Sequence, residues 1–397
     1  MGGSLPPFLM VSEPGSFAEY TIVQRKPQII ADILDTNPYN VEVAAALRSF
    51  LDELRTGQVA PLLEQTDDAD FWREAWLLWQ GKPWLELSWF FAETYFYRRV
   101  LEIIGYFQPG PGYLRDPFAY QKRRALQDGL QQLGLFCASL PAGLPLAEQF
   151  TLWLHHSLWG NRFDLSNVQA IVEATRLQRH ETSENLMLID HTARLWNLFS
   201  AGRIRRLDLL ADNSGLELLS DLALVDLLLA HDLVEQVRFH LKSQPFFVSD
   251  AMPQDFAATQ KALQAHPQPK LRDLGARLEQ YQHAGRIAAC THPFWTTCLF
   301  FSQFPPDLAQ TLAEADLILC KGDVNYRRLL EDRHWPPTTD LADATHFMPA
   351  PFASLRTLKG ELIVGLPEGL AESLEQRDPT WLINGKRGLI HLVYPGI

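Results

Sequence analysis

Polar residues that could hold a divalent cation follow two apolar runs in the second half of the chain. Asp212 and Asn213 follow the run RIRRLDLLA, and Asp250 ends the segment PFFVSD that comes after the next run. Two carboxylates and an amide oxygen are hard ligands, which suit Mg²⁺ or Mn²⁺ and leave positions for water and substrate oxygens. The pattern favours these three residues as cation ligands, and no Cys/His set with zinc spacing competes with them.

Two lysines near strand-like runs could neutralise the charge of a phosphate. Lys321 follows the run ADLILC and begins the segment KGDVN, whereas Lys359 lies in LRTLKG, just before the run ELIVGL. An ammonium group can stabilise a phosphoryl group that also contacts a metal. Taken alone, Lys321-Gly322 is only a strand-to-turn transition.

The same acidic residues also have structural interpretations. Asp212 precedes Ser214, Gly215 and an amphipathic segment, which is close to an ideal N-cap sequence. A helix that begins at Ser214 would present backbone N–H groups to an anion, so capping and ligand binding are compatible. Asp250 alone fits the start of another helix, because Pro253 follows it closely.

Other polar residues of the region are given structural roles. Glu217 and Asp221, after the predicted cap, are interpreted as a favourable first-turn charge and a residue of a solvated helix face. His155, His156 and His292 lie among aromatic residues and are interpreted as structural histidines. None of these is predicted to bind ligand.

The rhythm of the sequence changes near residue 200, which predicts two structural units. Before it, segments such as NVEVAAALRSFLDELRTG and RRALQDGLQQLGLFCASL have the apolar spacing of helices. After it, the runs RIRRLDLLA, LVEQVRFHLK, AGRIAAC, ADLILC and ELIVGL alternate with helical stretches such as LELLSDLALVDLLLAH and PQDFAATQKALQAH, as in an open α/β sheet. Such sheets bind ligands at the carboxyl ends of their strands. Residues 180–200 fit either unit.

The composition excludes several classes of partner. The formal net charge is -12, and Lys and Arg form only short groups, so the basic surface expected for nucleic-acid binding is missing. No segment approaches the ~20 uncharged apolar residues that span a bilayer, and the four cysteines form no C-x-x-C pair. We therefore expect a protein of the reducing cytoplasm. The aromatic-rich residues 71–107 are expected to form core rather than a ligand platform.

Several ordered segments resemble the metal-dependent damage-control phosphatases, a family formerly called domain of unknown function 89. Those of the second half are DNSG with its following helix, PFFVSD, LILCKGDVNYRRLLEDRHW and LRTLKGELIVGL. GSFAEYTIVQRKPQIIADILD, PWLELSWFFAETYFYRRVLE and SLWGNRFDLS resemble the branch of eukaryotic sugar-phosphate phosphatases, whose human member was also described as an acidic-residue methyltransferase. The resemblance covers nearly the whole chain. It implies an α/β fold, with a helical subdomain at residues 1–190 and a Rossmann-like α/β/α core at residues 191–397.

The resemblance also implies an activity and a site. The activity is metal-dependent hydrolysis of small phosphomonoesters, such as fructose 1-phosphate or fructose 6-phosphate, with Mn²⁺, Mg²⁺, Co²⁺ or Ni²⁺ as cofactor. Asp212, Asn213 and Asp250 would bind the cation and act in catalysis with Lys321. The residues that would contact the phosphorylated metabolite are Asp212, Asn213, Lys321, Gly322, Asp323, Val324, Asn325 and Lys359. Arg356 matches the R of R-T-L-K, and both ligand contact and loop fixation remain open for it. The oligomeric state is open, and a monomer is compatible.

Three other functions remain open on sequence alone. A phosphoaspartyl phosphatase would use Asp212 as nucleophile, but such enzymes usually carry a second Asp two residues later, where this chain has Ser214. An S-adenosylmethionine-dependent carboxyl methyltransferase usually needs a Gly-rich turn after its first strand, and DNSG has one glycine. A non-catalytic binding scaffold is supported only by the aromatic content. We rank hydrolysis first.

Overall fold

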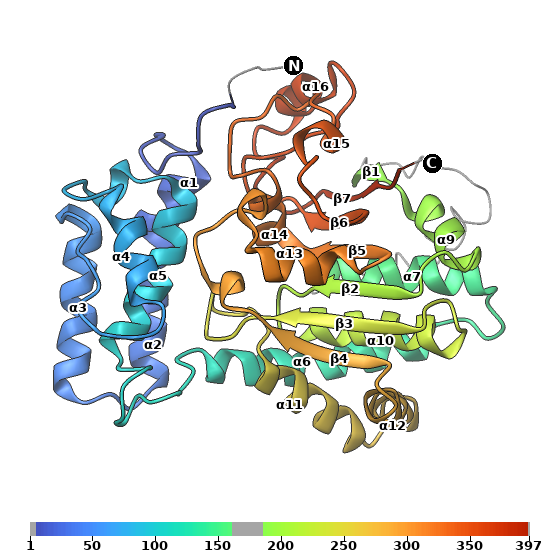
Figure 1. The fold of residues 1–397 in the computed structure, drawn as a ribbon. Helices are drawn as coiled ribbons and strands as arrows, with labels where there is room; N and C mark the ends of the chain where they lie inside the picture. The colour runs from blue at the N-terminus through green and yellow to red at the C-terminus, as the bar shows by residue number, and fades with distance from the viewer. Residues whose placement is uncertain (1–4, 161–185, 396–397) are drawn as a thin grey trace.

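The computed structural model describes residues 5–160 and 186–395. A bundle of helices lies beside a β-sheet that carries helices on both faces (Figure 1). Residues 161–166, part of the signature SLWGNRFDLS, and residues 180–185, which fit either predicted unit, lie outside the described residues. Within the described part of the chain, no helix has the length and apolar character needed to cross a membrane.

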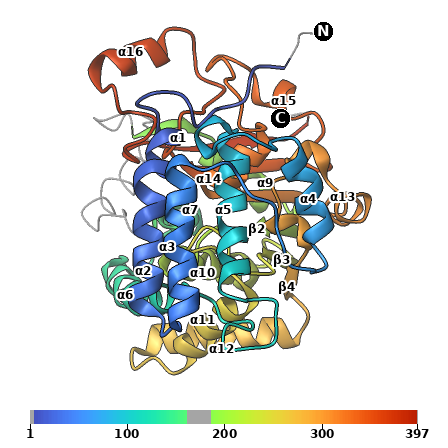
Figure 2. The same ribbon diagram turned by 90° about the vertical axis from the view of Figure 1, so that its left-hand side faces the viewer.

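The helical bundle has an aromatic core. Its elements are α1 (Phe17–Tyr20), a turn of π-helix (Thr21–Arg25), α2 (Lys26–Thr36), α3 (Val41–Thr56), α4 (Ala69–Leu77) and α5 (Trp89–Ile103), seen face-on in Figure 2. Helix α5 is buried without a break from Trp89 to Leu101. Trp72 packs on Tyr95 with ring centroids 5.6 Å apart. The aromatic-rich segment is therefore core, as expected.

The described residues form a seven-stranded sheet in the order β1-β7-β6-β5-β2-β3-β4. Strands β2 to β6 run parallel, whereas β7 is antiparallel to β6 and parallel to β1. The strands are β1 (Met187–Asp190), β2 (Arg206–Leu210), β3 (Gln236–Leu241), β4 (Ile287–Thr291), β5 (Leu317–Lys321), β6 (Phe352–Thr357) and β7 (Gly388–Val393). Four of the predicted strand runs are confirmed.

The fifth predicted strand, ELIVGL at residues 361–366, is wrong. The segment is buried but irregular, because its backbone bonds to neighbouring loops: Gly365 N donates to Thr339 O and Leu366 N to Pro337 O, both at 2.8 Å. Its buried apolar side chains, such as Ile363, produce the same sequence pattern as a buried strand, which explains the wrong prediction.

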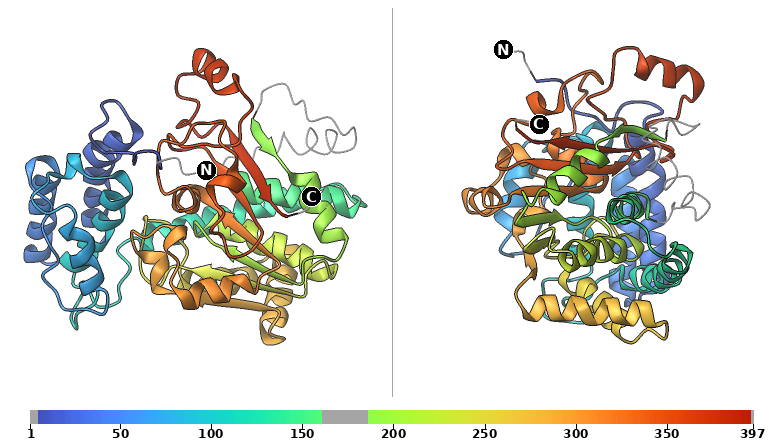
Figure 3. Two further views of the ribbon diagram at one scale, coloured as in Figure 1. Left: turned by 45° about the horizontal axis from the view of Figure 1, so that its top comes forward. Right: turned by 90° about the vertical axis from the view of Figure 1, so that its right-hand side faces the viewer.

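Helices cover both faces of the sheet and complete an α/β/α core, which confirms the predicted fold class (Figure 3). Leu207 and Leu209 of β2 pack on one side, and the next residue, Leu210, packs on the other. The first layer contains α6 (Ala119–Ser139), α7 (Leu146–Trp159), α9 (Thr192–Ser200), α10 (Leu216–Ala230), α11 (Pro253–Gln264) and α12 (Pro269–His283). The second contains α13 (Pro306–Ala313), α14 (Gly322–Leu329), α15 (Leu341–Ala344) and α16 (Leu370–Arg377).

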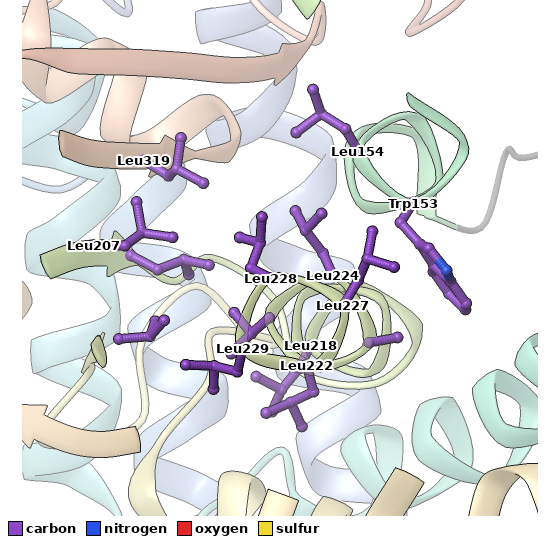
Figure 4. Packing of buried hydrophobic residues seen from close by; sticks show 14 of the residues in the cluster. Trp153, Leu154, Leu207, Leu218, Leu222, Leu224, Leu227, Leu228, Leu229 and Leu319 are labelled. Atoms are coloured by element: carbon purple, nitrogen blue, oxygen red, sulfur yellow. The ribbon is translucent and has the colours of Figure 1, made fainter. Parts of the chain in front are cut away.

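Helix α10 is buried on all sides. It lies between α7, represented by Trp153 and Leu154, and strands β2 and β5, represented by Leu207 and Leu319 (Figure 4). Every residue from Leu216 to Leu229 except Glu217 is buried. A helix that is apolar all round belongs inside a protein.

In the N-terminal half of the chain, the bundle core ends at Phe118, and Leu133 of α6 already packs in the core on the first face of the sheet. The predicted boundary at residue 190 lies after α6 and α7. Helices α6 and α7 pack on α10 and share its core, although they precede that boundary. A helix has the same apolar spacing whether it packs on other helices or on a sheet. The spacing alone therefore could not show that α6 and α7 belong to the sheet core.

An N-terminal segment, residues 7–11, joins the two parts. On the core side Leu9 N donates to Asp332 O at 2.8 Å, and Pro7 O accepts from His334 N at 2.9 Å. On the bundle side Leu9 O accepts from Trp89 N at 2.9 Å. The segment is therefore bonded to both parts.

Candidate active site

The predicted cation ligands lie together at the carboxyl ends of β2 and β3. Asp212 and Asn213 follow β2, and Asp250 lies in the loop between β3 and α11. The two loops are joined by their backbones: Asn213 and Asp250 form an isolated antiparallel bridge, and Ala251 N donates to Asp212 O at 2.8 Å. Backbone bonds between the loops fix the spacing of the side chains.

The two carboxylates are buried with little compensating charge. Asp212 is 7% exposed and Asp250 is 1% exposed. Burial, with repulsion from Glu217 and Asp250, raises the pKa of Asp212 well above its usual range. Burial raises the pKa of Asp250 to about 6, although its Oδ2 lies 3.3 Å from the Lys242 ammonium. The cations nearby, Lys242 among them, do not offset the burial of the two carboxylates.

The donor chemistry fits a hard divalent cation. Within the described residues, Asp212 Oδ1 is a buried oxygen without a hydrogen-bond donor, and the only cation close to the buried Asp250 Oδ2 is the Lys242 ammonium at 3.3 Å. No three His, Cys, Asp or Glu side chains in the same part of the chain converge as a metal cluster, so the set needs Asn213 as its third member. Carboxylate and amide oxygens together suit Mg²⁺ or Mn²⁺.

Asn213 binds its neighbours rather than capping a helix. Its Nδ2 donates to Asp212 Oδ2 at 2.7 Å and to Glu217 Oε2 at 2.9 Å, and its Oδ1 accepts from Ser249 Oγ at 2.5 Å. The predicted cap and helix start at Ser214 are wrong: α10 begins at Leu216 and has no side-chain cap bond. Asp212 and Asn213 instead face the β3 loop and each other.

Gly322 makes the close approach between β5 and the β2 loop possible. Its φ of +80° lies in the left-handed region, and a Cβ atom there would lie 1.9 Å from Asp212 Oδ2. Nearby, Asn325 Nδ2 donates to Leu210 O at 3.2 Å and to Lys321 O at 2.8 Å, which ties β5 to β2. Asn325 Oδ1 is a buried oxygen with no partner within the described residues, and Val324 packs into the bundle core.

Lys321 is buried inside a cluster of acceptors. Its Nζ donates to Ser157 O at 2.7 Å and Asp221 Oδ1 at 2.8 Å, and lies 3.2 Å from Glu217 Oε1. Burial lowers the pKa of Lys321, but the two carboxylates outweigh it, so the pKa is raised and the lysine is charged. Asp221 is 1% exposed, so the solvated-face interpretation is wrong.

Several residues of this site were not predicted from the sequence. Glu217, Asp221 and Ser157 surround Lys321, and Lys242 lies beside Asp250. One signal was available: the α10 sequence is apolar all round, so any acid within it must be buried. Nothing in the sequence indicated that Ser157, on α7, would reach the site.

Asp323 and Arg356 form a structural joint. Asp323 accepts from Arg356 Nε at 2.7 Å and Arg327 Nε at 2.8 Å. Burial raises the pKa of Asp323, but the two guanidinium groups outweigh it and hold that pKa well below its usual range. Arg356 also donates to Gly360 O at 3.1 Å and to Leu362 O, so it fixes the loop after β6.

Lys359 presents an exposed cation near the carboxylate pair. It follows β6, its side chain is exposed, and its charge lowers the pKa of Asp212 against the larger effect of burial. No hydrogen bond or ion pair of Lys359 occurs among the described residues. Its ammonium is therefore open to an anionic ligand.

The bundle packs directly on the loop that carries Asp250. Phe247 and Val248 have φ values of 47° and 64°, which are strained for such side chains. Tyr97 of α5 packs on Phe247 with centroids 5.2 Å apart. Aromatic packing thus holds a strained loop in the conformation that presents Asp250.

Open α/β sheets bind ligands at the carboxyl ends of their strands, and similarity to known proteins gives the class of this protein as a phosphatase. The profile described as "Damage-control phosphatase ARMT1-like domain" matches residues 21–374. The chain belongs to this family.

Similar proteins extend along the whole chain. Damage-control phosphatase ARMT1 of Danio rerio is 33% identical over 442 residues, covering 99% of this chain and 98% of that protein. The Mus musculus protein of the same name is 34% identical, covering 98% and 99%, and the Homo sapiens protein is 32% identical, covering 97% and 98%. A solved DUF89 family protein from Pyrococcus horikoshii matches 94% of this chain and 97% of that chain, at 12% identity and a TM-score of 0.49.

Proposed function

We propose that this phosphatase hydrolyses small phosphomonoesters with a divalent cation held by Asp212, Asn213 and Asp250. Mn²⁺ or Mg²⁺ is the preferred cofactor, with Co²⁺ and Ni²⁺ as alternatives, because hard oxygen ligands accept all four. The observation that carries the proposal is the buried, undercompensated carboxylate pair, in which Asp212 Oδ1 has no donor among the described residues. When bound, such a cation lowers the pKa of a coordinated water and offsets charge on the phosphoryl group.

The surrounding residues are proposed to bind and orient the substrate. Lys359 offers its exposed ammonium to the phosphoryl oxygens. The side chains of Asp323 and Val324 are engaged elsewhere, so the segment from Gly322 would contact substrate through backbone N–H groups at the start of α14. Lys321 would reach phosphate by replacing Glu217, its most distant partner at 3.2 Å.

We propose sugar phosphates, such as fructose 1-phosphate or fructose 6-phosphate, as substrates. The name of the family, which refers to damage control, supports a small metabolite rather than a macromolecule. The four cysteines are all free thiols, which supports action in the reducing cytoplasm.

A phosphatase screen across sugar phosphates and the four cations tests this proposal. Asp212→Ala and Asp250→Ala should each lower kcat/KM by about 10³-fold, or roughly 4 kcal/mol of transition-state stabilisation. Asp273→Ala, at an exposed position of α12, is the matched control and should retain full activity. Full activity in both site variants would contradict the assignment, as would tight S-adenosylmethionine binding without a metal requirement.

A further inference from the structure

Lys242 is a buried cation of the site to which the proposed function gives no role. It follows β3 directly, and its side chain is 3% exposed. Its ammonium lies 3.3 Å from Asp250 Oδ2 and donates to Ala211 O, the carbonyl just before Asp212, at 3.1 Å. The ammonium therefore contacts both of the loops that carry the carboxylate ligands.

The main chain fixes the position of this lysine. Lys242 N donates to Ala251 O at 2.9 Å, and Ala251 N donates to Asp212 O at 2.8 Å. Lys242, the residue after Asp250 and the first cation ligand are thus joined through backbone hydrogen bonds. Because the side chain is enclosed as well, its ammonium would reach water only if the two loops moved.

The charge of Lys242 acts on both carboxylates. Burial raises the pKa of Asp212 and of Asp250, and the charge of Lys242 lowers both. Among the described residues, Asp250 is the only carboxylate within ion-pair distance of this ammonium. One ammonium opposes two buried carboxylates, so it balances the pair only in part and leaves a negative charge for a divalent cation to neutralise.

The role of this lysine changes when Asp212, Asn213 and Asp250 hold the proposed cation. The two carboxylates then neutralise the divalent charge, so the ammonium of Lys242 leaves the loaded site with a net positive charge. Like charges this close repel each other strongly in a buried site, which weakens cation binding. The same positive charge favours a phosphoryl group, which is an anion.

We propose that Lys242 is a built-in counter-ion that limits how tightly the site binds its divalent cation and strengthens the binding of phosphate once the cation is bound. In the metal-free protein it stabilises Asp212 and Asp250, and in the loaded protein it opposes the cation. A lysine that served only to join the two loops would instead strengthen the binding of both ligands. This inference rests on the cation site of the function proposed above.

Two variants of Lys242 separate its charge from its hydrogen bond. Lys242→Gln removes the charge and keeps a donor for Ala211 O, whereas Lys242→Arg keeps the charge. Isothermal titration at about pH 8 should show about tenfold tighter Mn²⁺ binding to Lys242→Gln than to the wild type, because the opposing charge is gone. With Mn²⁺ saturating, the inhibition constant of inorganic phosphate against p-nitrophenyl phosphate should rise about tenfold. Lys242→Arg should stay within about threefold of the wild type in both measurements.

Urea unfolding gives a readout that does not depend on activity. Without metal, Lys242→Gln should have a lower urea midpoint than the wild type, because the buried carboxylates lose their counter-ion. Saturating Mn²⁺ should remove this deficit, because the cation supplies the missing charge. Lys26→Met, which breaks the buried Lys26–Glu93 ion pair of the bundle, is the matched control. Its deficit relative to the wild type should be the same with and without Mn²⁺.

A double variant keeps the test open if Lys242→Gln does not fold without metal. Lys242→Gln combined with Asp250→Asn removes both charges of the ion pair, so the metal-free double variant should be more stable than Lys242→Gln alone. A double variant that is less stable than Lys242→Gln would show that the lysine does not act through the charge of Asp250.

Three other results overturn the inference alone. They are Mn²⁺ binding to Lys242→Gln that is no tighter than to the wild type, an unchanged phosphate inhibition constant, and a urea deficit that persists at saturating Mn²⁺. A wild-type protein that binds Mn²⁺ but hydrolyses no phosphomonoester removes the proposed function, whereas the titration and the unfolding still decide this inference. A wild-type protein that binds none of the four cations removes both.

Discussion

Two charged clusters lie at the carboxyl ends of the strands: the buried carboxylates Asp212 and Asp250, and the partly buried Asp323 with its two arginines. They differ in how their charge is balanced. Asp212 and Asp250 have raised pKa values, and the nearest ammonium to Asp250 Oδ2 is 3.3 Å away. Asp323 lies within 2.8 Å of two guanidinium groups, and its pKa is held low. Positive charge does not offset burial in the first cluster, whereas two guanidinium groups outweigh it in the second. We propose that the first binds a cation, whereas the second joins β5, β6 and their loops.

The largest expected effect separates activity from stability in the first cluster. Asp212→Asn should lower kcat/KM by about 10³-fold, because a ligand of the proposed cation loses its charge. The same change should leave the metal-free protein as stable or more stable, because one of several repelling buried carboxylates is removed. Steady-state kinetics and urea unfolding of the metal-free protein measure the two effects. A clear loss of metal-free stability would break the comparison.

The second cluster should respond in the opposite way. Arg356→Met removes one cation from Asp323 and leaves two loop carbonyls without their donor. Breaking a buried pair typically costs about 3–5 kcal/mol, so the free energy of unfolding should fall by that amount. Urea unfolding measures it, with Arg48→Met as the exposed control. A loss below about 1 kcal/mol would show that the cluster is not a structural joint.

Gly322 connects the two clusters, and its substitution should act on the cation. Gly322→Ala places a methyl group against the Asp212 carboxylate, whereas Gly81→Ala has nearly the same φ, 77°, with no atom within 4 Å. Both changes incur the strain of a left-handed alanine, of order 1 kcal/mol. Only Gly322→Ala should raise the Mn²⁺ concentration for half-maximal activity, by about tenfold or more. Equal Mn²⁺ requirements in the two variants would contradict the close contact.

The smallest effect is a pH dependence of cation binding. The raised pKa of Asp250, about 6, means that the folded carboxyl binds its proton more tightly than the unfolded one. Its contribution to stability is therefore present below pH 4 and is lost as pH rises through 6. Cation affinity should change in the opposite direction with pH, because the cation binds the ionised carboxylate. Mn²⁺ affinity should therefore be about tenfold weaker at pH 5 than at pH 7.5. Isothermal titration checks this, and equal affinities would contradict it.

The sequence predicted the strands that carry the site because they are buried on both faces. Runs such as ADLILC are short, apolar and bounded by polar residues, and parallel strands between helical layers have that composition. Once the strands were in place, the carboxyl-end rule was enough to bring Asp212, Asn213 and Asp250 together. That part of the site required only strand positions.

The parts of the fold and site that were predicted wrongly depend on tertiary packing. ELIVGL has the composition of a strand, but Arg356 and two neighbouring loops take its backbone hydrogen bonds. Asp221 was assigned to a solvated face because the helix was considered alone, whereas α7 covers it and supplies Ser157. The predicted helix start at Ser214 failed because Ser214 N donates to Ser249 O of the β3 loop, so the helix begins two residues later. Each error concerns a partner that is distant in the chain.

The N-terminal segment that joins the two parts constrains how the protein is assembled during synthesis. Its bundle partner, Trp89, leaves the ribosome early, but its core partners, Asp332 and His334, emerge only when most of the chain has been made. Until then the bundle can fold on its own core, but residues 7–11 cannot yet form their hydrogen bonds to Asp332 and His334. The seam between bundle and core, which Phe17 N bridges to Glu361 Oε1, therefore closes among the last steps of assembly.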